Sequence, residues 1–304
     1  MTGLEVVARM FAVALTGDVG AGKSTLSRTW RSMGANVIDA DAVAKDQWSR
    51  PEIQSAMTGR WGPEVLRDGA PDYAKIAERA FSNDEEYSFT NSLIHPAARA
   101  EIARRVSALR GWIVVEIPLF FESGGAQWAD WVVYVTAPDE DRVRRNASRG
   151  WAGEEIARRE RFLMASEKKQ KMADRILRND GDMASWEASA LNLGKLLRAI
   201  SGVCEVTTFC ESAGEVDGIA SELLRRKLAA CVNISEAASR YVWRGEERRH
   251  PEWRLSCKTI EANIRTVRDC IRKNHSYELP AITATELCRS DFETLKWIAD
   301  SCSE

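Results

Sequence analysis

Hydrophobic residues follow two spacing patterns along the first two hundred residues. Short apolar runs, typical of buried strands, alternate with longer stretches in which apolar residues recur every three or four positions, as on one face of a helix. The expected strands are residues 11–16, 36–39, 112–117, 131–136 and 175–177. The expected helices are residues 23–33, 41–49, 97–109, 139–149, 153–172 and 184–199. This alternation predicts an α/β domain with a doubly wound parallel sheet.

The last hundred residues follow a different order of elements. The expected strands are residues 203–210, 230–235, 239–245, 252–259 and 281–287. The expected helices are residues 215–229, 261–273 and 291–301. Two strand–helix–strand units of this kind predict a ferredoxin-like α+β sandwich.

The cysteines indicate where the two parts meet. All seven lie at or after Cys204, and 304 residues are enough for about two domains. An odd number of cysteines, without a basic and then apolar leader, argues against a disulfide framework and favours a cytoplasmic protein. The short stretch Ser201-Gly202 is the expected boundary between the two domains. We therefore predict a first domain over residues 1–200 and a second over residues 203–304.

Composition narrows the classes of partner that this chain is expected to bind. The chain is 44% hydrophobic, which permits real cores, and its net charge is only −2. That charge argues against a general binder of nucleic acid or of membrane surfaces. No run of 18 apolar residues is present, so no membrane span is expected.

The segment from Gly17 to Ser24 has the form G-x-x-x-x-G-K-[ST]. It lies between an expected strand and an expected helix, the setting in which a glycine-rich loop points successive N–H groups at phosphate. Lys23 would reach the terminal phosphates of a nucleoside triphosphate, and the Ser24 hydroxyl would hold Mg²⁺. The residues expected to surround the nucleotide are Gly17, Gly20, Ala21, Gly22, Lys23, Ser24 and Thr25.

Two acids follow the second expected strand. Catalytic groups gather at the carboxyl ends of strands in an open parallel sheet, so either acid could accept the proton of an attacking hydroxyl. Either could instead cap the next helix, because aspartate favours that position. We assign the role of proton acceptor to Asp41, which leaves Asp39 as the candidate for the helix cap.

Several motifs resemble those of the dephospho-CoA kinases, and they occur in that family's order. The resemblance covers residues 1 to about 199. The matching segments are residues 11–48, Leu93-Ile94-His95-Pro96, residues 116–122, and Ala137-Pro138 followed by Arg145 and Arg149. The resemblance implies ATP-dependent phosphorylation of the ribose 3′-hydroxyl of dephospho-CoA, with Asp41 accepting or orienting that hydroxyl. It also implies that Asn179 lies beside the adenine ring.

The resemblance implies a lid over about residues 139–172, and the distribution of charge supports it. Between Arg142 and Arg178 there are twelve Lys or Arg residues and five acids, and cations that neutralise the moving phosphoryl group supply much of phosphoryl-transfer catalysis. The family match favours phosphate contact for Arg145 and Arg149. For Lys168, Lys169 and Lys171 we predict a solvated helix face. A helical insertion over about residues 42–110 would cover the acceptor substrate.

Two further candidates keep two interpretations each. Glu116, at the end of a strand, could orient Mg²⁺ through water or contact a neighbouring backbone amide. His95 could touch substrate, or could be a packing or capping group at a helix start. Asp18 departs from the family, which commonly has a second glycine there.

The second part resembles the CutA family of divalent-ion tolerance proteins over about residues 203–304. The matching segments are residues 228–234, 241–245, 257–259 and 275–280. The resemblance implies a homotrimer, in which we expect the hairpin at Trp243 to contact a neighbouring subunit. Cys210 and His275 match a copper site proposed for relatives, although Asn274 replaces an adjacent histidine. A thiolate and an imidazole suit Cu⁺ or Zn²⁺, yet a buried thiol and a surface histidine are the alternative.

Two other functions stay open at this point. One is a kinase for another small hydroxyl acceptor on the same phosphate-loop scaffold. The other is a non-catalytic regulator that responds to nucleotide and is built on a CutA-like trimer.

Overall fold

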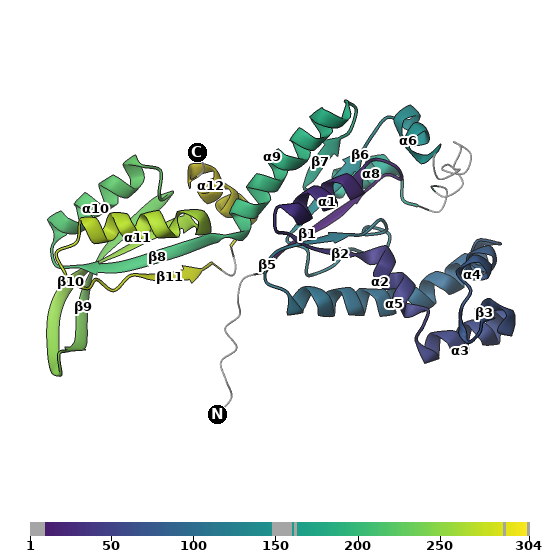
Figure 1. Ribbon diagram of the computed structural model, residues 1–304, viewed down its shortest axis with the longest axis horizontal. Helices are drawn as coiled ribbons and strands as arrows, with labels where there is room; N and C mark the ends of the chain where they lie inside the picture. Colours follow the sequence, from purple (N-terminus) through teal and green to yellow (C-terminus); the bar gives the residue numbers. More distant parts are fainter. Residues whose placement is uncertain (1–9, 148–159, 161–162, 288–289, 303–304) are drawn as a thin grey trace. The chain divides into compact units, whose positions relative to one another are not determined.

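The computed structural model describes residues 10–147, 160, 163–287 and 290–302 (Figure 1). Contacts divide the chain into two compact units, one built on Ala12–Ala190 and one chiefly on Leu191–Glu304. No helix within these described ranges combines the length and the apolar character needed to cross a bilayer.

The first unit is built on a five-stranded sheet with the order β2-β5-β1-β6-β7. The pairs β2–β5, β1–β6 and β6–β7 are parallel. Residues 12–15 of the central strand are fully buried, as expected for a strand covered on both faces. The strands are β1 (Met10–Gly17), β2 (Asn36–Asp39), β5 (Gly111–Glu116), β6 (Trp131–Thr136) and β7 (Arg175–Arg178). The predicted α/β class is confirmed.

Helices connect these strands. The fully buried Trp30 of the first helix donates a hydrogen bond from Nε1 to the carbonyl oxygen of Ala190, 2.8 Å away. This bond ties the first helix to the last one of the unit. The helices are α1 (Lys23–Ser32), α2 (Ala40–Gln47), α5 (Asp84–Ala108), α6 (Asp139–Asn146), α8 (Ser166–Met172) and α9 (Met183–Ser201).

A small helical subdomain lies between α2 and α5. It contains α3 (Pro51–Trp61), a short 3₁₀ turn (Pro63–Val65), the two-residue strands β3 (Leu66–Arg67) and β4 (Ala70–Pro71), and α4 (Tyr73–Ala80). Trp48 and Trp61 form its core with their rings 6.4 Å apart, and Phe89 meets Trp61 edge-on at 5.4 Å. These aromatic side chains therefore pack against one another.

Helix α5 is longer than the sequence predicts, and this changes the place of His95. The helix begins at Asp84, where the Asn83 side chain accepts a hydrogen bond from the N–H of Glu86 at 2.9 Å. His95 therefore lies in mid-helix, and its prediction at a helix start is wrong. The error arises from Pro96, which usually ends or starts a helix but here stands inside one.

The helix predicted over residues 153–172 is, by contrast, shorter than expected within the described residues. Residues 163–165 are not helical, and α8 begins at Ser166. Residues 153–159 and 161–162 lie outside the described residues.

The second unit is a four-stranded antiparallel sheet with the order β11-β8-β10-β9, which confirms the predicted ferredoxin-like class. Helices α10 and α11 lie side by side on one face of this sheet (Figure 1). Five of the six cysteines that the structure describes are buried, as small apolar residues would be. The elements are β8 (Val203–Cys210), α10 (Ala213–Arg225), β9 (Cys231–Trp243), β10 (Glu246–Ile260), a 3₁₀ turn (Glu261–Asn263), α11 (Ile264–Lys273), β11 (Thr283–Glu286) and α12 (Phe292–Cys302).

Strands β9 and β10 form one long hairpin, where the sequence predicts a break near residue 236. Their pairing runs without interruption from Trp243 opposite Glu246 to Cys231 opposite Lys258. The connecting residues Arg244 and Gly245 both have positive φ, at 51° and 84°. A two-residue turn of this kind matches the right-handed twist of the flanking strands.

Candidate active site

The phosphate loop runs from the end of β1 to the start of α1. Gly17 has φ 142°, and a Cβ there would lie 2.1 Å from the carbonyl oxygen of Val135, so a side chain does not fit. Gly22, with φ 105°, precedes the helix and offers no side-chain cap, and the first turn contains no acid. The N–H groups at this end of α1 and its positive dipole are therefore available to an anion.

Lys23 is held over the loop. Its Nζ donates to the carbonyl oxygens of Gly17 and Asp18, each at 2.9 Å. Burial lowers the pKa of Lys23 to about 8, against the opposing effect of Glu116, Asp18 and Asp41. The ammonium group is thus poorly solvated and strongly attracted to further negative charge, which is what a phosphate-binding lysine requires.

The two acids after β2 have separate roles in the structure. Asp39 is the N-cap of α2, because its Oδ1 accepts from the N–H groups of Asp41 at 2.9 Å and Ala42 at 3.1 Å. Asp41 lies in the first turn of the helix. Burial raises the pKa of Asp41, and the neighbouring charges of Asp39 and Glu116 raise it further, although Lys23 opposes them. A carboxylate with a raised pKa is a better acceptor for a hydroxyl proton.

Glu116 lies directly opposite Asp39, at the carboxyl end of β5. Its Oε2 accepts a hydrogen bond of 2.7 Å from the hydroxyl of Ser27, one turn along α1 from the exposed Ser24. The charge of Glu116 acts on both Lys23 and Asp41. Carboxylate and hydroxyl oxygens at one end of the sheet are the ligand type that Mg²⁺ prefers, so these residues fit that ion.

Asp18 anchors the loop to the sheet, a role that the sequence did not predict. Its buried carboxylate accepts from the hydroxyl of Tyr134 at 2.5 Å and from that of Thr136 at 2.7 Å. The Tyr134 oxygen also lies 3.1 Å from the hydroxyl of Ser166 on α8. The one sequence signal was the departure from the family's usual glycine at this position.

Lys169 departs from its prediction as a solvated residue. Lys168 and Lys171 are exposed as predicted, but Lys169 is only 3% exposed. Its Nζ lies 3.3 Å from the Glu122 carboxylate and 5.9 Å from the centre of the Tyr134 ring. Burial of a lysine is tolerated here because the carboxylate accompanies it.

Arg145 and Asn179 connect helix α6 to the loop. Arg145 Nη2 donates to the backbone and side-chain oxygens of Asn179, at 3.3 and 3.2 Å. Asn179 Nδ2 in turn donates to the carbonyl oxygen of Ala21 at 2.9 Å. Arg145 Nη1 is buried without a hydrogen-bond partner among the described residues, so it can bind an anion near the loop. Arg149 lies outside the described residues.

His95 shares a cavity with Asp41. The cavity has a volume of about 200 Å³, and we call it the acceptor cavity; its lining includes Asp41, His95, Arg99, Ile117 and Leu119. Partial burial and the charge of Arg99 lower the pKa of His95, so its ring is neutral at pH 7. The structure thus brings His95 and Asp41, 54 residues apart in sequence, to one place.

A second group of chemically active residues lies in the other unit. The Sγ of Cys210, a carboxylate oxygen of Glu215 and a ring nitrogen of His275 all lie within 4.8 Å of one another. The His275 Nε2 lies 3.0 Å from the carbonyl oxygen of Phe209. Burial, with the charge of Glu215, raises the pKa of the Cys210 thiol to about 12. The sequence did not indicate Glu215 as a member of this cluster, because it is the fold that brings α10 beside Cys210 and His275.

Comparison with known families identifies both parts of the chain. Residues 11–185 match the family model of dephospho-CoA kinase. The chain belongs to the dephospho-CoA kinase family. Residues 204–301 match the model of the CutA1 divalent ion tolerance protein, so the chain joins segments of two families. Both resemblances expected from the sequence are confirmed.

Individual relatives agree with this result. A dephospho-CoA kinase from Deinococcus radiodurans is 37% identical over 180 residues, which are 58% of this chain and 86% of the relative. One from Carboxydothermus hydrogenoformans is 35% identical over 191 residues, or 60% of this chain and 91% of the relative. The crystal structure of TT1252 from Thermus thermophilus is 33% identical, covers 61% of this chain and 96% of its own, and superposes with a TM-score of 0.52.

Proposed function

We propose that this chain transfers the γ-phosphoryl group of ATP to the ribose 3′-hydroxyl of dephospho-CoA, giving CoA and ADP. The observation that carries this proposal is the convergence of Lys23 and Asp41 at the carboxyl ends of β1 and β2, in a chain of the dephospho-CoA kinase family. The oxygen–phosphorus bond to ADP breaks as the bond to the 3′-oxygen forms. We place this reaction in the cytoplasm, where ATP is supplied.

Each part of the site has a separate task in this reaction. The N–H groups at the start of α1 and the Lys23 ammonium hold the phosphates of ATP and neutralise charge on the transferred group. Asp41 accepts the proton of the 3′-hydroxyl. Ser24, with Glu116 nearby, would hold Mg²⁺, which would neutralise phosphate charge. Asn179 contributes to nucleotide binding by holding the Ala21 carbonyl.

An ADP-release assay tests this function against its alternatives. With ATP and Mg²⁺, we expect ADP only when dephospho-CoA is present, together with CoA detected by mass spectrometry. Release with AMP as the acceptor would indicate a kinase for another hydroxyl acceptor. Release without any acceptor would indicate a nucleotide-driven switch.

Replacing Arg145 with alanine is expected to lower kcat roughly tenfold or more, because the guanidinium neutralises developing charge. The change also removes two hydrogen bonds to Asn179, so the KM for ATP is expected to rise. Steady-state kinetics measure both quantities. Arg144→Ala is the matched control, since that neighbouring side chain is 75% exposed. Near-normal turnover in a folded Arg145→Ala protein would remove this residue from the site.

We propose that the second domain, residues 203–304, assembles the chain into a homotrimer. Strand β9 is an edge of its sheet and carries exposed apolar side chains, among them Val242 at 71% exposure and Trp243 at 37%. Exposed apolar edges favour association. Light scattering at micromolar concentration is expected to give three times the chain mass of 34.0 kDa, and Trp243→Asp is expected to reduce it. A monomeric wild-type protein would contradict the proposal.

We propose that Cys210, Glu215 and His275 form a weak site for Zn²⁺ or Cu⁺. The thiolate is the binding form, so a metal must displace the Cys210 proton, and the raised thiol pKa makes this costly. Zinc affinity is therefore expected to rise about tenfold per pH unit between pH 6.5 and 8.5. Competition with a chromophoric chelator measures this rise. Cys210→Ser is expected to abolish it and Cys231→Ser to preserve it, whereas pH-independent binding would exclude the thiol as a ligand.

A further inference from the structure

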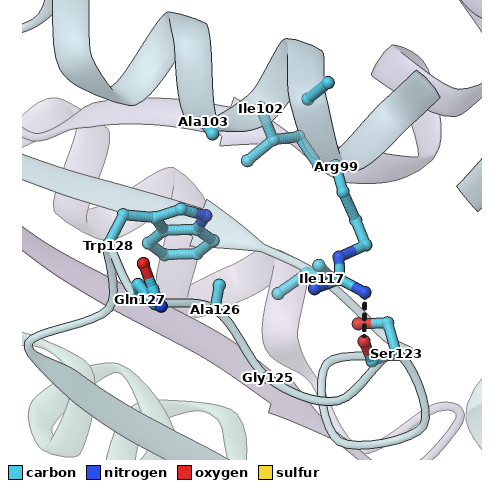
Figure 2. Close-up of a pocket in the computed structure, with 10 residues that line it drawn as sticks. Arg99, Ile102, Ala103, Ile117, Ser123, Gly125, Ala126, Gln127 and Trp128 are labelled. Carbon is cyan, nitrogen blue, oxygen red and sulfur yellow. Dashed lines mark hydrogen bonds between the residues drawn. The ribbon is translucent and has the colours of Figure 1, made fainter. Parts of the chain in front are cut away.

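A second hollow adjoins the acceptor cavity. It has a volume of about 470 Å³ and lies between helix α5 and the loop that follows β5 (Figure 2). This volume is in the range of roughly 300–1,000 Å³ that is typical of small-molecule sites. We call it the Trp128 recess; its lining includes Arg99, Ile102, Ala103, Ile117, Ala126 and Trp128.

The recess and the acceptor cavity adjoin each other and share part of their lining. Four residues line both of them, namely Arg99, Ile102, Ile117 and Ser123. Asp41, the proposed proton acceptor, lines the acceptor cavity only, and Trp128 lines the recess only. A substrate that reacts at Asp41 would reach the recess by crossing the residues that the two hollows share.

Arg99 belongs to the lining that the two hollows share, which we call the junction. Its side chain is exposed, and Nη1 donates to the carbonyl oxygen of Ser123 at 2.6 Å (Figure 2). That bond uses one of the five guanidinium donors, and no other hydrogen bond or ion pair of Arg99 is found within the described ranges. Arg99 also faces a further hollow, shared with His95 and Glu122, but the Glu122 carboxylate is neutralised by Lys169. The junction is thus positively charged.

The lining of the recess is mostly apolar. Ile102 and Ile117 are almost completely buried, and the half-buried indole of Trp128 forms the opposite wall. The Trp128 ring meets Phe120 edge-on with their centres 6.2 Å apart, which fixes its orientation. Gln127 lies at the rim and adds an amide. Such a surface suits a thin, flexible chain with methyl and methylene groups and a few amides.

We propose that the Trp128 recess binds the pantetheine arm of dephospho-CoA and that Arg99 binds its diphosphate. This inference rests on the proposed function. Dephospho-CoA carries its ribose hydroxyl, its diphosphate and its arm in that order, which matches Asp41 in the acceptor cavity, Arg99 in the shared lining and Trp128 in the recess. The Arg99 fork suits a diphosphate, because a planar guanidinium can donate two parallel hydrogen bonds to phosphate oxygens.

The test compares two acceptors in the full-length enzyme. One is dephospho-CoA, and the other is the P²-methyl ester of ADP, which keeps the diphosphate but lacks the arm. Trp128→Ala is expected to raise the KM for dephospho-CoA at least tenfold, with kcat and the KM for ATP within threefold of wild type. The same variant is expected to change kcat/KM for the methyl ester less than twofold. Trp128→Phe is expected to restore most of the affinity.

Arg99 is tested with the same pair of acceptors. Arg99→Met is expected to raise the KM for both at least tenfold, because both keep the diphosphate. Arg104→Met is the matched control, since Arg104 lies on the same helix, is 68% exposed and pairs with Glu101. It is expected to leave both KM values unchanged. Thermal unfolding confirms that each variant is folded.

The outcomes separate this inference from the function on which it rests. If wild type does not phosphorylate dephospho-CoA, the proposed function fails. If wild type is active but Trp128→Ala impairs both acceptors equally, or neither, the arm lies elsewhere and only the recess assignment fails. If Arg99→Met leaves both KM values near wild type, the diphosphate does not contact Arg99.

Discussion

Replacing Asp41 with asparagine is expected to lower kcat about 10²–10⁴-fold while ATP still binds. The amide has nearly the shape of the carboxylate but does not accept the proton of the 3′-hydroxyl. Stopped assays that quantify CoA measure the loss, and calorimetry measures ATP affinity. Asp39→Asn is the matched control, because asparagine also accepts hydrogen bonds at an N-cap and α2 keeps its start. Its kcat is expected to stay within tenfold of wild type.

The pH profile should identify the same group. A base works only when it is ionised, and the pKa of Asp41 lies above its ordinary value. Acidification through that raised pKa is therefore expected to reduce kcat/KM, with full activity on the alkaline side of it. The residual activity of Asp41→Asn should lack this acid limb. An unchanged limb in that variant, or a kcat near that of wild type, would mean that another group accepts the proton.

Replacing Lys23 with methionine is expected to lower kcat by about 10²–10³-fold and to weaken ATP binding. Methionine keeps most of the length and the apolar stem but removes the charge that neutralises the phosphates. It also frees the carbonyl oxygens of Gly17 and Asp18 from their shared donor. Kinetics with saturating dephospho-CoA, together with nucleotide titration, measure both effects. Lys45→Met serves as a control, because its Nζ lies over the exposed Tyr73 ring at 4.5 Å.

Proton uptake gives a second readout for Lys23. In the free protein the pKa of Lys23 is about 8, so the side chain is mostly charged below pH 8 and mostly neutral above it. Bound phosphates favour the charged form, so ATP binding above pH 8 is expected to take up a proton and to weaken as the pH rises. Calorimetry in two buffers of different ionisation enthalpy detects this uptake. Equal proton uptake in Lys23→Met would show that another group is responsible.

Local sequence signals located most of the proposed catalytic groups. The loop from Gly17 to Ser24 needs glycines because a side chain at Gly17 would overlap the backbone of Val135. The two acids after β2 were identified as candidate catalytic groups because such groups gather at the carboxyl ends of strands. The sequence also favoured Asp41 for the chemistry, and the hydrogen bonds of the structure show that Asp39 is the cap. That Asn179 lies beside adenine stays a prediction.

Elements that depend on distant partners were predicted less well. Pro96 indicated a helix boundary, but packing of α5 against α2 and the small helical subdomain carries the helix through it. Strand β9 is continuous because β10 pairs with it along its whole length, although its own residues 236–238 favour a break. In both cases tertiary contacts outweigh a weak local preference.

The sequence alone determined the two-part organisation, both fold classes, the phosphate loop and the candidate base, because each depends on the order of residues within a short segment. The tertiary structure decided which groups meet across long separations. Lys169 is buried beside Glu122, Asp18 is held by Tyr134, and Arg99 lines one hollow with Asp41 and another with Trp128. The physical reason is that burial and charge pairing depend on neighbours brought together by the fold, which no local pattern of the chain records.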